Sequence, residues 1–334
     1  MSASTVLGRV CRRLGTVLLA VALTHCGGDD RTAPPAGLPR VRLALNWFPE
    51  AEHGGFYAAQ VHGYYQREGL EVEILGGGPD APVIQRVATG GVEFGVTNAD
   101  DVLYARAQQA PIQALFAPYQ INPRCIMVHA ASGIDSIGGI ADLTLALSQR
   151  PAFSHYLRHR FPFRGVTLVP YPGNVTQFLA DPRYAQQAYV FSEPYVARRQ
   201  GADPRVLLVA EVGFNPYASV VIATESTIAT RPAIVAGLVR AVRAGWEQYL
   251  RDPEPTNRRI HELNPEMDLE VLAYGASVSS SLVVDSTAGA SGIGRMTVER
   301  WRRLRDQMVE CGLLDPGSVD PDQAFTTRFL APAP

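Results

Sequence analysis

Short apolar runs and amphipathic runs alternate along most of the chain. The apolar or alternating runs predict strands over residues 41–45, 71–75, 92–96 and 112–117. The longer runs between them have the spacing of helices, over residues 54–65, 81–88 and 100–109. Such alternation is typical of an α/β protein whose sheets are mostly parallel.

The same pattern starts again near residue 126. Strands are predicted over residues 125–129, 143–147, 167–169 and 188–191, with helices over 153–160 and from 174 onward. The C-terminal third is richer in helix. This order predicts two α/β units, followed by a helical tail that returns to the first unit.

Two strongly amphipathic helices are expected in that tail. Thr230 is the expected N-cap of the first, with Pro232 in its first turn, and an apolar stripe runs through Trp246. The second covers residues 297–311 and carries Trp301 on its stripe. We interpret both stripes as parts of the core.

The N-terminus has the features of a secretory signal. Residues 1–13 carry three arginines, and residues 14–23 are apolar but too few to span a membrane as a stable helix. Cys26 then follows as a lipidation candidate, although His25 departs from the small residue normally found before such a cysteine. We expect a signal peptide over residues 1–25 and a linker over 26–39. A soluble periplasmic form and a retained anchor are the alternatives.

Composition excludes several functions. The chain has 334 residues, 46% of them hydrophobic, and no long run of one charge, so a nucleic-acid partner is not expected. All 30 basic residues of the Lys plus Arg count are arginine, which excludes a lysine Schiff base and a phosphate-binding GxxxxGK[ST] loop. Cys125 and Cys311 have no metal-site spacing, and no metal or cofactor is expected.

Three stretches carry a family resemblance. They are LNWFPEAEHGGFYAAQVHGYY with the following EGLEVEI, then VATGGVEFGVTNADDVLYARA, and finally GIGRMTVERWRRLRDQMVECGLL. Over residues 41–331 the chain resembles periplasmic solute-binding proteins of the thiamine-pyrimidine-precursor type, within the nitrate, sulfonate and taurine ABC transporter superfamily.

The resemblance implies a two-lobed type II periplasmic binding protein fold. One lobe would comprise residues 40–127 plus 219–334, and the other residues 128–218. It also implies a monomeric receptor that hands a small molecule to an ABC permease in the inner membrane, from the periplasmic face and held there by a lipid anchor. A receptor that feeds a signalling protein is an alternative.

The same superfamily contains a fungal pyrimidine synthase, which consumes its own histidine and holds pyridoxal phosphate on a lysine. At the corresponding positions this chain has Thr97 in place of the lysine and Asp101 in place of the histidine. The cysteine-rich stretch of that enzyme corresponds to residues 213–218, which contain no cysteine. We therefore expect a binding protein and not an enzyme.

Ligands of open α/β sheets bind beyond the carboxyl ends of the strands. Asn46 and Trp47 follow the first predicted strand, and Trp47 can stack on a flat ring or form a wall of the core. His53 and Tyr57 come at the next helix, where each either contacts the ligand or supports the helix.

Asn98 and Asp100 follow another strand of the first lobe, where Asp100 is also a good N-cap. In the second lobe the candidates are Ser148, Asn174 and Glu193; Glu193 either accepts hydrogen bonds from an amino-pyrimidine or pairs with Arg198. Tyr217 could stack opposite Trp47. These residues favour a neutral or cationic heterocycle, such as a thiamine pyrimidine precursor, over an anion. Riboflavin and sulfonates remain alternatives, the latter because of Arg150.

Overall fold

A computed structural model describes residues 37–284 and 292–330, and the chain from Leu38 to Pro334 forms one compact unit. The predicted signal peptide, the predicted lipidation of Cys26 and the linker as far as residue 36 lie outside the described residues. Within the described part, no helix is long and apolar enough to cross a membrane.

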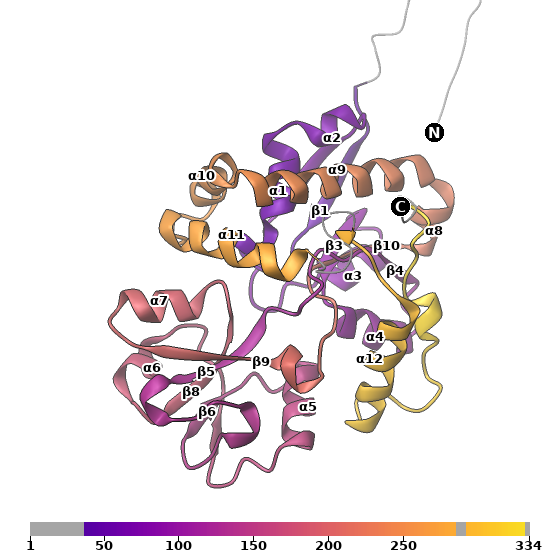
Figure 1. Cartoon of the computed structure of the whole chain (residues 1–334). Helices are drawn as coiled ribbons and strands as arrows, with labels where there is room; N and C mark the ends of the chain where they lie inside the picture. The colour runs from indigo at the N-terminus through magenta and orange to yellow at the C-terminus, as the bar shows by residue number, and fades with distance from the viewer. Residues whose placement is uncertain (1–36, 285–291, 331–334) are drawn as a thin grey trace, which may run out of the picture. The chain divides into compact units, whose positions relative to one another are not determined.

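The first of two sheets has the strand order β2-β1-β3-β10-β4 (Figure 1). Its strands are β1 (Arg40–Ala44), β2 (Glu71–Leu75), β3 (Phe94–Thr97), β4 (Ile112–Phe116) and β10 (Val220–Thr224). β1 pairs in parallel with β2 and β3, whereas β10 runs antiparallel to both β3 and β4. β10 is therefore the reversed strand of this sheet. All four residues of the central strand β3 are buried, as expected for a strand covered on both faces.

The second sheet repeats this arrangement, in the order β7-β6-β8-β5-β9. Its strands are β5 (Arg124–His129), β6 (Thr144–Ala146), β7 (Thr167–Val169), β8 (Tyr184–Tyr189) and β9 (Pro204–Leu208). β6 is parallel to β7 and β8, and β5 is antiparallel to β8 and β9. Here β5 is the reversed strand.

Each reversed strand follows directly after the chain has crossed between the sheets. The first crossing, residues 117–123, joins β4 to β5, and the second, residues 209–219, joins β9 to β10. The predicted two-lobed α/β fold with mostly parallel sheets is confirmed. One boundary differs: residues 124–127, assigned to the first lobe from the sequence, form the start of β5 and are hydrogen bonded within the second sheet.

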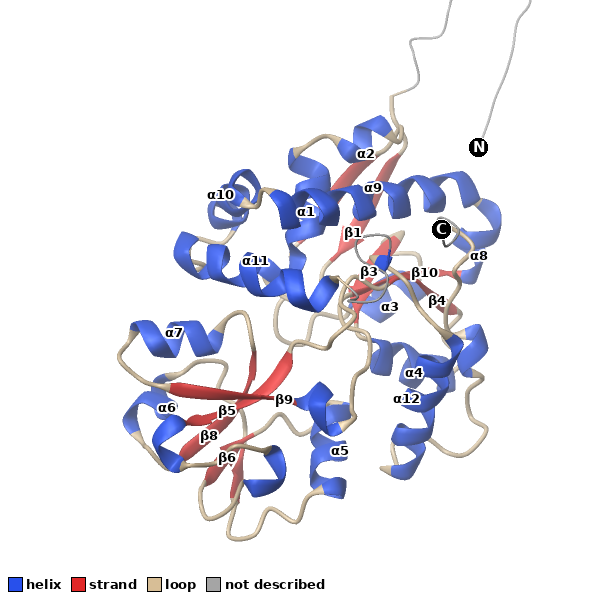
Figure 2. Cartoon of the chain, in the orientation of Figure 1, coloured by secondary structure: helices blue, strands red, loops and turns tan. Residues whose placement is uncertain are grey.

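Helices pack on both sheets (Figure 2). In the first lobe they are α1 (Gly54–Val61), α2 (Tyr64–Arg67), α3 (Val83–Ala88), α4 (Ala99–Ala107), α8 (Glu225–Thr230), α9 (Pro232–Arg251), α10 (Glu254–Leu263), α11 (Leu269–Val283) and α12 (Val298–Glu310). In the second lobe they are α5 (Ala152–Arg160), α6 (Thr176–Ala180) and α7 (Glu193–Arg199). Short 3-10 turns cover Ala51–His53, Ala130–Ser132, Ile137–Gly139, Val209–Val212 and Pro321–Gln323.

The two expected C-terminal helices form as α9 and α12, and both apolar stripes are core. Trp246 and Trp301 are fully buried. α9 begins at Pro232, as expected, but its N-cap is Arg231; Thr230 ends the preceding helix α8 and its hydroxyl donates to the Ser226 carbonyl. Only Arg231 separates the end of α8 from the start of α9. Thr230 is therefore still part of α8 and does not cap α9.

Candidate functional site

Polar side chains from both lobes meet where strands of the two sheets end. In the first lobe, Glu50 and Glu52 follow β1, and Asp100 and Asp101 follow β3. In the second lobe Glu193 follows β8. Because β5 runs against β8, its first residue pairs with the last residue of β8, which places Arg124 beside Tyr189 at the same sheet edge. We call this set the interlobe cluster: Glu50, Glu52, Asp100, Asp101, Arg124, Tyr189 and Glu193.

The first-lobe carboxyl groups at α4 bond to both lobes. The N-cap of α4 is Asn98, not Asp100 as the sequence suggested, which leaves Asp100 in the first turn. Its carboxylate accepts from the backbone N–H of Ala152, the first residue of α5 in the second lobe. Asp101 accepts from the Thr97 hydroxyl at 3.1 Å and from the Asn98 backbone N–H. Asp100 thus interacts with both lobes, while Asp101 bonds to residues at the N-terminus of α4.

These two groups hold protons more tightly than ordinary aspartates do. Burial, followed by the negative charge of Asp101, raises the pKa of Asp100 to about 7, although Arg124 acts in the opposite direction. Burial also raises the pKa of Asp101, against its hydrogen bonds and the Arg124 charge. Groups with perturbed pKa values cluster at functional sites, so this pair is a candidate for one.

Glu50 and Glu52 form a second acidic pair, and both are buried. The Glu52 carboxylate accepts a hydrogen bond from the Ser219 hydroxyl. Burial, followed by the charges of Glu52 and Glu193, raises the pKa of Glu50 well above its usual range. A side-chain hydrogen bond from Glu52 also raises the pKa of Glu50 and so favours its protonated form.

Arg124 is the positive charge that faces these acids. Its Nη2 donates to the Tyr189 hydroxyl at 2.8 Å. The guanidinium carbon lies 4.3 Å from the Phe153 ring centroid and 4.7 Å from that of Tyr189. Asp100, Asp101 and Glu52 all act on it electrostatically. Its planar face is therefore held by aromatic rings while its charge is shared among several carboxylates.

Glu193 is held by its own lobe. Its carboxylate accepts from the Tyr171 hydroxyl at 2.5 Å and from the Tyr189 backbone N–H at 2.9 Å. Burial raises its pKa in spite of these bonds. The alternative pairing with Arg198 does not occur, because that guanidinium donates to the Tyr274 hydroxyl and to the Pro204 carbonyl.

Other predicted site residues lie at the same strand ends. Asn46 and His53 are joined by an Oδ1 to Nε2 contact of 3.1 Å, and burial lowers the pKa of His53. Trp47 is half-buried and packs edge-on against Phe48. In the second lobe, Ser148 makes two hydrogen bonds with the Gln187 amide, at 2.7 and 2.9 Å.

Three predicted contacts are placed elsewhere. Tyr57 is 1% exposed and belongs to the first-lobe core. Asn174 is exposed, and its side chain accepts from the Thr176 N–H to start α6. Tyr217 is buried under Arg300 and its hydroxyl accepts from the Thr297 N–H, so it does not stack opposite Trp47.

Sequence reasoning missed five members of the interlobe cluster, namely Glu50, Glu52, Asp101, Arg124 and Tyr189. The spacing of two glutamates in PEAEH was a usable signal, since residues directly after a strand at this sheet edge were already candidates. Arg124 was not recognisable, because its place depends on the direction of β5.

Direct contacts between the lobes flank the cluster. Arg150 lies 3.6 Å from Asp80, and Arg199 lies 2.6 Å from Asp268. Tyr195 in α7 stacks on Tyr274 in α11, with ring centroids 4.5 Å apart. These contacts join α7 and the residues before α5 to the first lobe, so the structure represents an arrangement in which the lobes touch.

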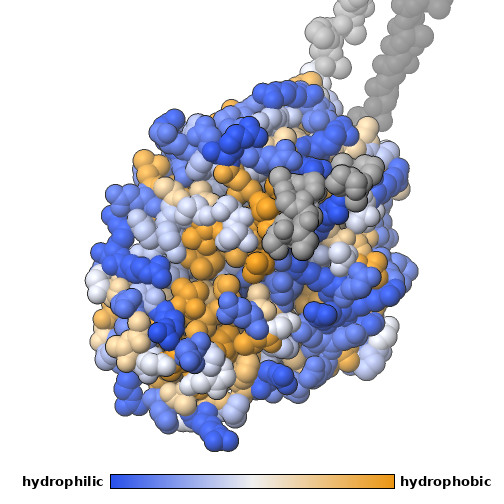
Figure 3. All heavy atoms as spheres, viewed as in Figure 1, coloured by the Kyte–Doolittle hydropathy of each residue, from blue (hydrophilic) through white to orange (hydrophobic). Residues whose placement is uncertain are grey.

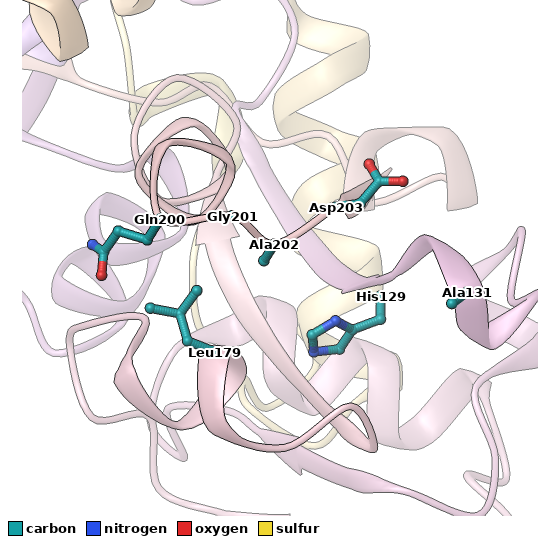
Figure 4. A pocket seen from close by; sticks show the side chains of 7 residues that line it. All are labelled: His129, Ala131, Leu179, Gln200, Gly201, Ala202 and Asp203. Atoms are coloured by element: carbon teal, nitrogen blue, oxygen red, sulfur yellow. The ribbon is translucent and has the colours of Figure 1, made fainter.

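A pocket of about 350 Å³ lies in the second lobe and is lined by His129, Ala131, Leu179, Gln200, Gly201, Ala202 and Asp203 (Figure 4). His129 is at the end of β5 farthest from Arg124, and its ring stacks on Phe178. None of the predicted contacts lines this pocket. Among the described residues, no group of His, Cys, Asp or Glu side chains is arranged to hold a metal ion.

The cysteines and the surface add little to the site. Cys125 and Cys311 are both free thiols, the first buried and the second half-buried. Figure 3 shows a face on which polar residues surround an apolar band near the centre.

The model of a protein family described as NMT1/THI5 like matches residues 50–256, which is more than half of the chain. The chain belongs to this family. It is 27% identical to the riboflavin-binding protein RibY of Chloroflexus aurantiacus, over 94% of this chain and 96% of the relative. It is 22% identical to a formylaminopyrimidine-binding protein of Halalkalibacterium halodurans, over 87% and 89% of the two chains.

Two further similarities complete the comparison. The periplasmic aliphatic sulphonate binding protein SsuA of Escherichia coli superposes with a TM-score of 0.66 at 14% identity, over 86% of this chain and 92% of that one, which shows the shared fold. A 101-residue stretch, 30% of this chain and 32% of the relative, is 30% identical to a 4-amino-5-hydroxymethyl-2-methylpyrimidine phosphate synthase of Legionella pneumophila. The proteins similar to this chain thus include both binding proteins and, over a shorter stretch, an enzyme.

Proposed function

We propose that this protein is the substrate-binding component of an ABC importer and binds a small heterocycle between its two lobes. The observation that carries the proposal is the interlobe cluster, in which desolvated carboxyl groups of both lobes meet at strand ends. Full-length similarity to a riboflavin-binding and a formylaminopyrimidine-binding protein supports it.

The chemistry of the cluster favours a ligand with N–H donors. Its carboxyl groups outnumber the Arg124 guanidinium, and each carboxylate oxygen accepts hydrogen bonds. Trp47, which follows β1 as Glu50 and Glu52 do, offers a flat apolar surface. An amino-pyrimidine of the thiamine-precursor type satisfies both conditions, and riboflavin is the alternative ring system. A sulfonate would bring a further negative charge next to these acids, which costs free energy in a desolvated site.

Ligand capture then depends on lobe movement. The contacts that flank the cluster must separate before a ligand can reach it, and they re-form around the bound molecule. Binding shifts the population toward the touching arrangement because the ligand interacts with both lobes at once. A permease that recognises this arrangement would accept the loaded receptor.

The enzyme alternative has less support. Thr97 and Asp101, at the positions of the synthase lysine and histidine, bond to each other at the start of α4. This hydrogen bond stabilises the start of the helix and gives neither side chain a catalytic role. We therefore infer a non-catalytic receptor, and mass spectrometry of protein and ligand after incubation is expected to show both unchanged. A mass shift in either would favour the enzyme.

We also propose a periplasmic location, with Cys26 lipidated and the receptor monomeric. Globomycin treatment or Cys26→Ser is expected to leave an unprocessed or soluble form. Wild-type protein that is processed equally in the presence of globomycin would contradict lipidation.

Isothermal titration tests the ligand. Purified protein is titrated with formylaminopyrimidine, riboflavin and an aliphatic sulfonate, and binding is expected for one of the first two. Trp47→Ala and Glu193→Gln should each weaken binding by about 1–3 kcal/mol. Tyr104→Ala is the control, since Tyr104 is 51% exposed on α4. No heat with either ring compound would contradict the proposed ligand class, and unchanged affinity in both site variants would contradict the proposed position.

A further inference from the structure

The two crossing segments contain the points about which the lobes can turn. A hinge lies where a segment stops being bonded to one lobe and begins to be bonded to the other. The hydrogen bonds of residues 117–123 and 209–219 therefore locate it.

In the first crossing, the lobe to which the backbone is hydrogen bonded changes between Asn122 and Pro123. The backbone N–H groups of Gln120 and Ile121 both donate to the Leu282 carbonyl of α11, at 2.8 and 2.9 Å, so these residues belong to the first lobe. The Pro123 carbonyl accepts from the Val190 N–H at 3.0 Å, in the second lobe.

In the second crossing, the lobe to which the backbone is hydrogen bonded changes between Val212 and Gly213. The Val212 carbonyl accepts from the Tyr156 hydroxyl of α5, at 2.9 Å. The next carbonyl, that of Gly213, accepts from Nε2 of Gln307 in α12, at 2.9 Å. Gly213 has φ = 95°, a value that glycine adopts far more readily than other residues. A bend at this point is compatible with the local backbone.

The two crossings are also tied to each other. Asn122 donates two hydrogen bonds to the second crossing: its backbone N–H to Asn215 Oδ1 at 2.8 Å, and its Nδ2 to the Pro216 carbonyl at 3.0 Å. Tyr119 and Ala218 form a β-bridge. The two segments are therefore expected to move together, as part of the first lobe, up to the hinge positions Asn122–Pro123 and Val212–Gly213.

Arg300 of α12 holds this pair from one side. Its Nη1 donates to the Gln120 carbonyl at 2.7 Å, its Nε to the Asn215 carbonyl at 2.7 Å and its Nη2 to Asn215 Oδ1 at 3.0 Å. The guanidinium carbon also lies 3.8 Å from the Tyr217 ring centroid. One side chain thus bonds to the backbone of both crossings, in the planar geometry that arginine provides.

We propose that Arg300 is a positioning residue for ligand capture: it fixes both crossings to the first lobe, so that the second lobe turns about Asn122–Pro123 and Val212–Gly213. Without it, the bend spreads over residues 117–123 and 213–219, and the ligand-binding residues of the two lobes no longer return to a single relative position. The proposal concerns the ligand-free protein and does not depend on which molecule it binds.

Hydrogen–deuterium exchange of the full chain without ligand tests whether Arg300 fixes both crossings. Arg300→Met keeps a long side chain but removes the guanidinium. The amides of Gln120 and Asn122 are expected to exchange about tenfold faster or more, because hydrogen bonds from a charged donor are lost. Amides of β1 and β8 should be unaffected, and small-angle X-ray scattering should show a larger radius of gyration. Arg300→Lys should recover part of both effects.

Arg303→Met is the matched control. Arg303 is an exposed arginine of the same helix, and it lines a small recess together with Arg300 and Asn215. This variant should behave like the wild-type protein. The proposal is overturned if Arg300→Met is folded and its crossing amides exchange at wild-type rates, or if Arg303→Met has the same effect. If Arg300→Met does not fold, Asn215→Ala replaces it, because Asn215 bonds to Arg300. The readout is then Gln120, whose N–H bonds to Leu282 and not to Asn215, and unchanged exchange of Gln120 also overturns the proposal.

Discussion

Asp100 shows how the behaviour of one carboxyl group depends on both lobes. It accepts a hydrogen bond from Ala152 of the second lobe, lies next to Asp101, and faces Arg124. Burial is the largest influence and favours the neutral acid. The group is therefore a site where proton binding and lobe contact are linked.

Stability should accordingly depend on pH through Asp100. Its pKa is raised from an ordinary 3.8 to about 7, so the folded protein binds this proton more tightly than the unfolded chain. The folded state then loses stability as pH rises between these two values. Asp100→Asn keeps an acceptor for Ala152 but cannot ionise. Its thermal midpoint relative to wild type should be higher at about pH 8 than at about pH 4.

Glu73→Gln is a suitable control for this measurement, because Glu73 is exposed on β2. An Asp100→Asn difference that does not change with pH would show that Asp100 does not titrate in this range.

At the scale of elements, α1 and α9 approach each other at two glycines that leave no room for a side chain. A Cβ atom at Gly245 would lie 2.1 Å from the Gly55 carbonyl oxygen, and one at Gly55 would lie 2.2 Å from Cγ of Trp246. Glycine at the contact is what allows the helices this approach. It lets α9 bury Trp246 against the helix that follows the β1 site residues, and so fixes the position of that helix.

Gly245→Ala should therefore lower the free energy of unfolding by about 1–3 kcal/mol, because the helices must separate. Gly237→Ala on the same helix is the matched control: its Cβ would meet ordinary contacts at 3.4 Å, so the better helix propensity of alanine should leave stability equal or slightly higher. Urea unfolding measures both. Equal destabilisation by the two variants would contradict the steric explanation.

For the whole molecule, exposed charges contribute to the touching arrangement of the lobes. Arg199 of α7 pairs with Asp268 at 2.6 Å and with Glu270 at 3.4 Å, both in or next to α11. α7 begins with Glu193 of the interlobe cluster. The same short helix thus carries both a contact between the lobes and the proposed ligand contact.

Arg199→Ala should weaken binding of whichever ring compound the titration identifies, although Arg199 is not a proposed contact. Exposed pairs contribute roughly 0.2–1 kcal/mol, so the loss is expected to be about fivefold at most and to shrink in high salt. Arg205→Ala is the control, because this exposed arginine bonds within its own lobe. A loss that persists unchanged in high salt would point to a direct ligand contact.

The α/β class, the two units, the two-lobed fold and the buried stripes of α9 and α12 could all be predicted from the sequence. Periodicity and burial are local properties, and the family motifs lie close together along the chain. Most of the predicted site residues lie directly after strands for the same reason, because residues there keep that position in any open sheet; that they contact a ligand stays a prediction.

The tertiary structure alone decided which side chains meet. Arg124 faces Asp100 only because β5 enters its sheet reversed, and the pKa of Glu50 is raised only because folding buries it and brings Glu52 and Glu193 near. Tyr57 and Tyr217 have suitable chemistry, yet packing directs them into the core. The hinge, too, depends on bonds between residues as distant in sequence as Gln120 and Arg300. Such pairings arise when long loops close, and no local pattern in the chain records them.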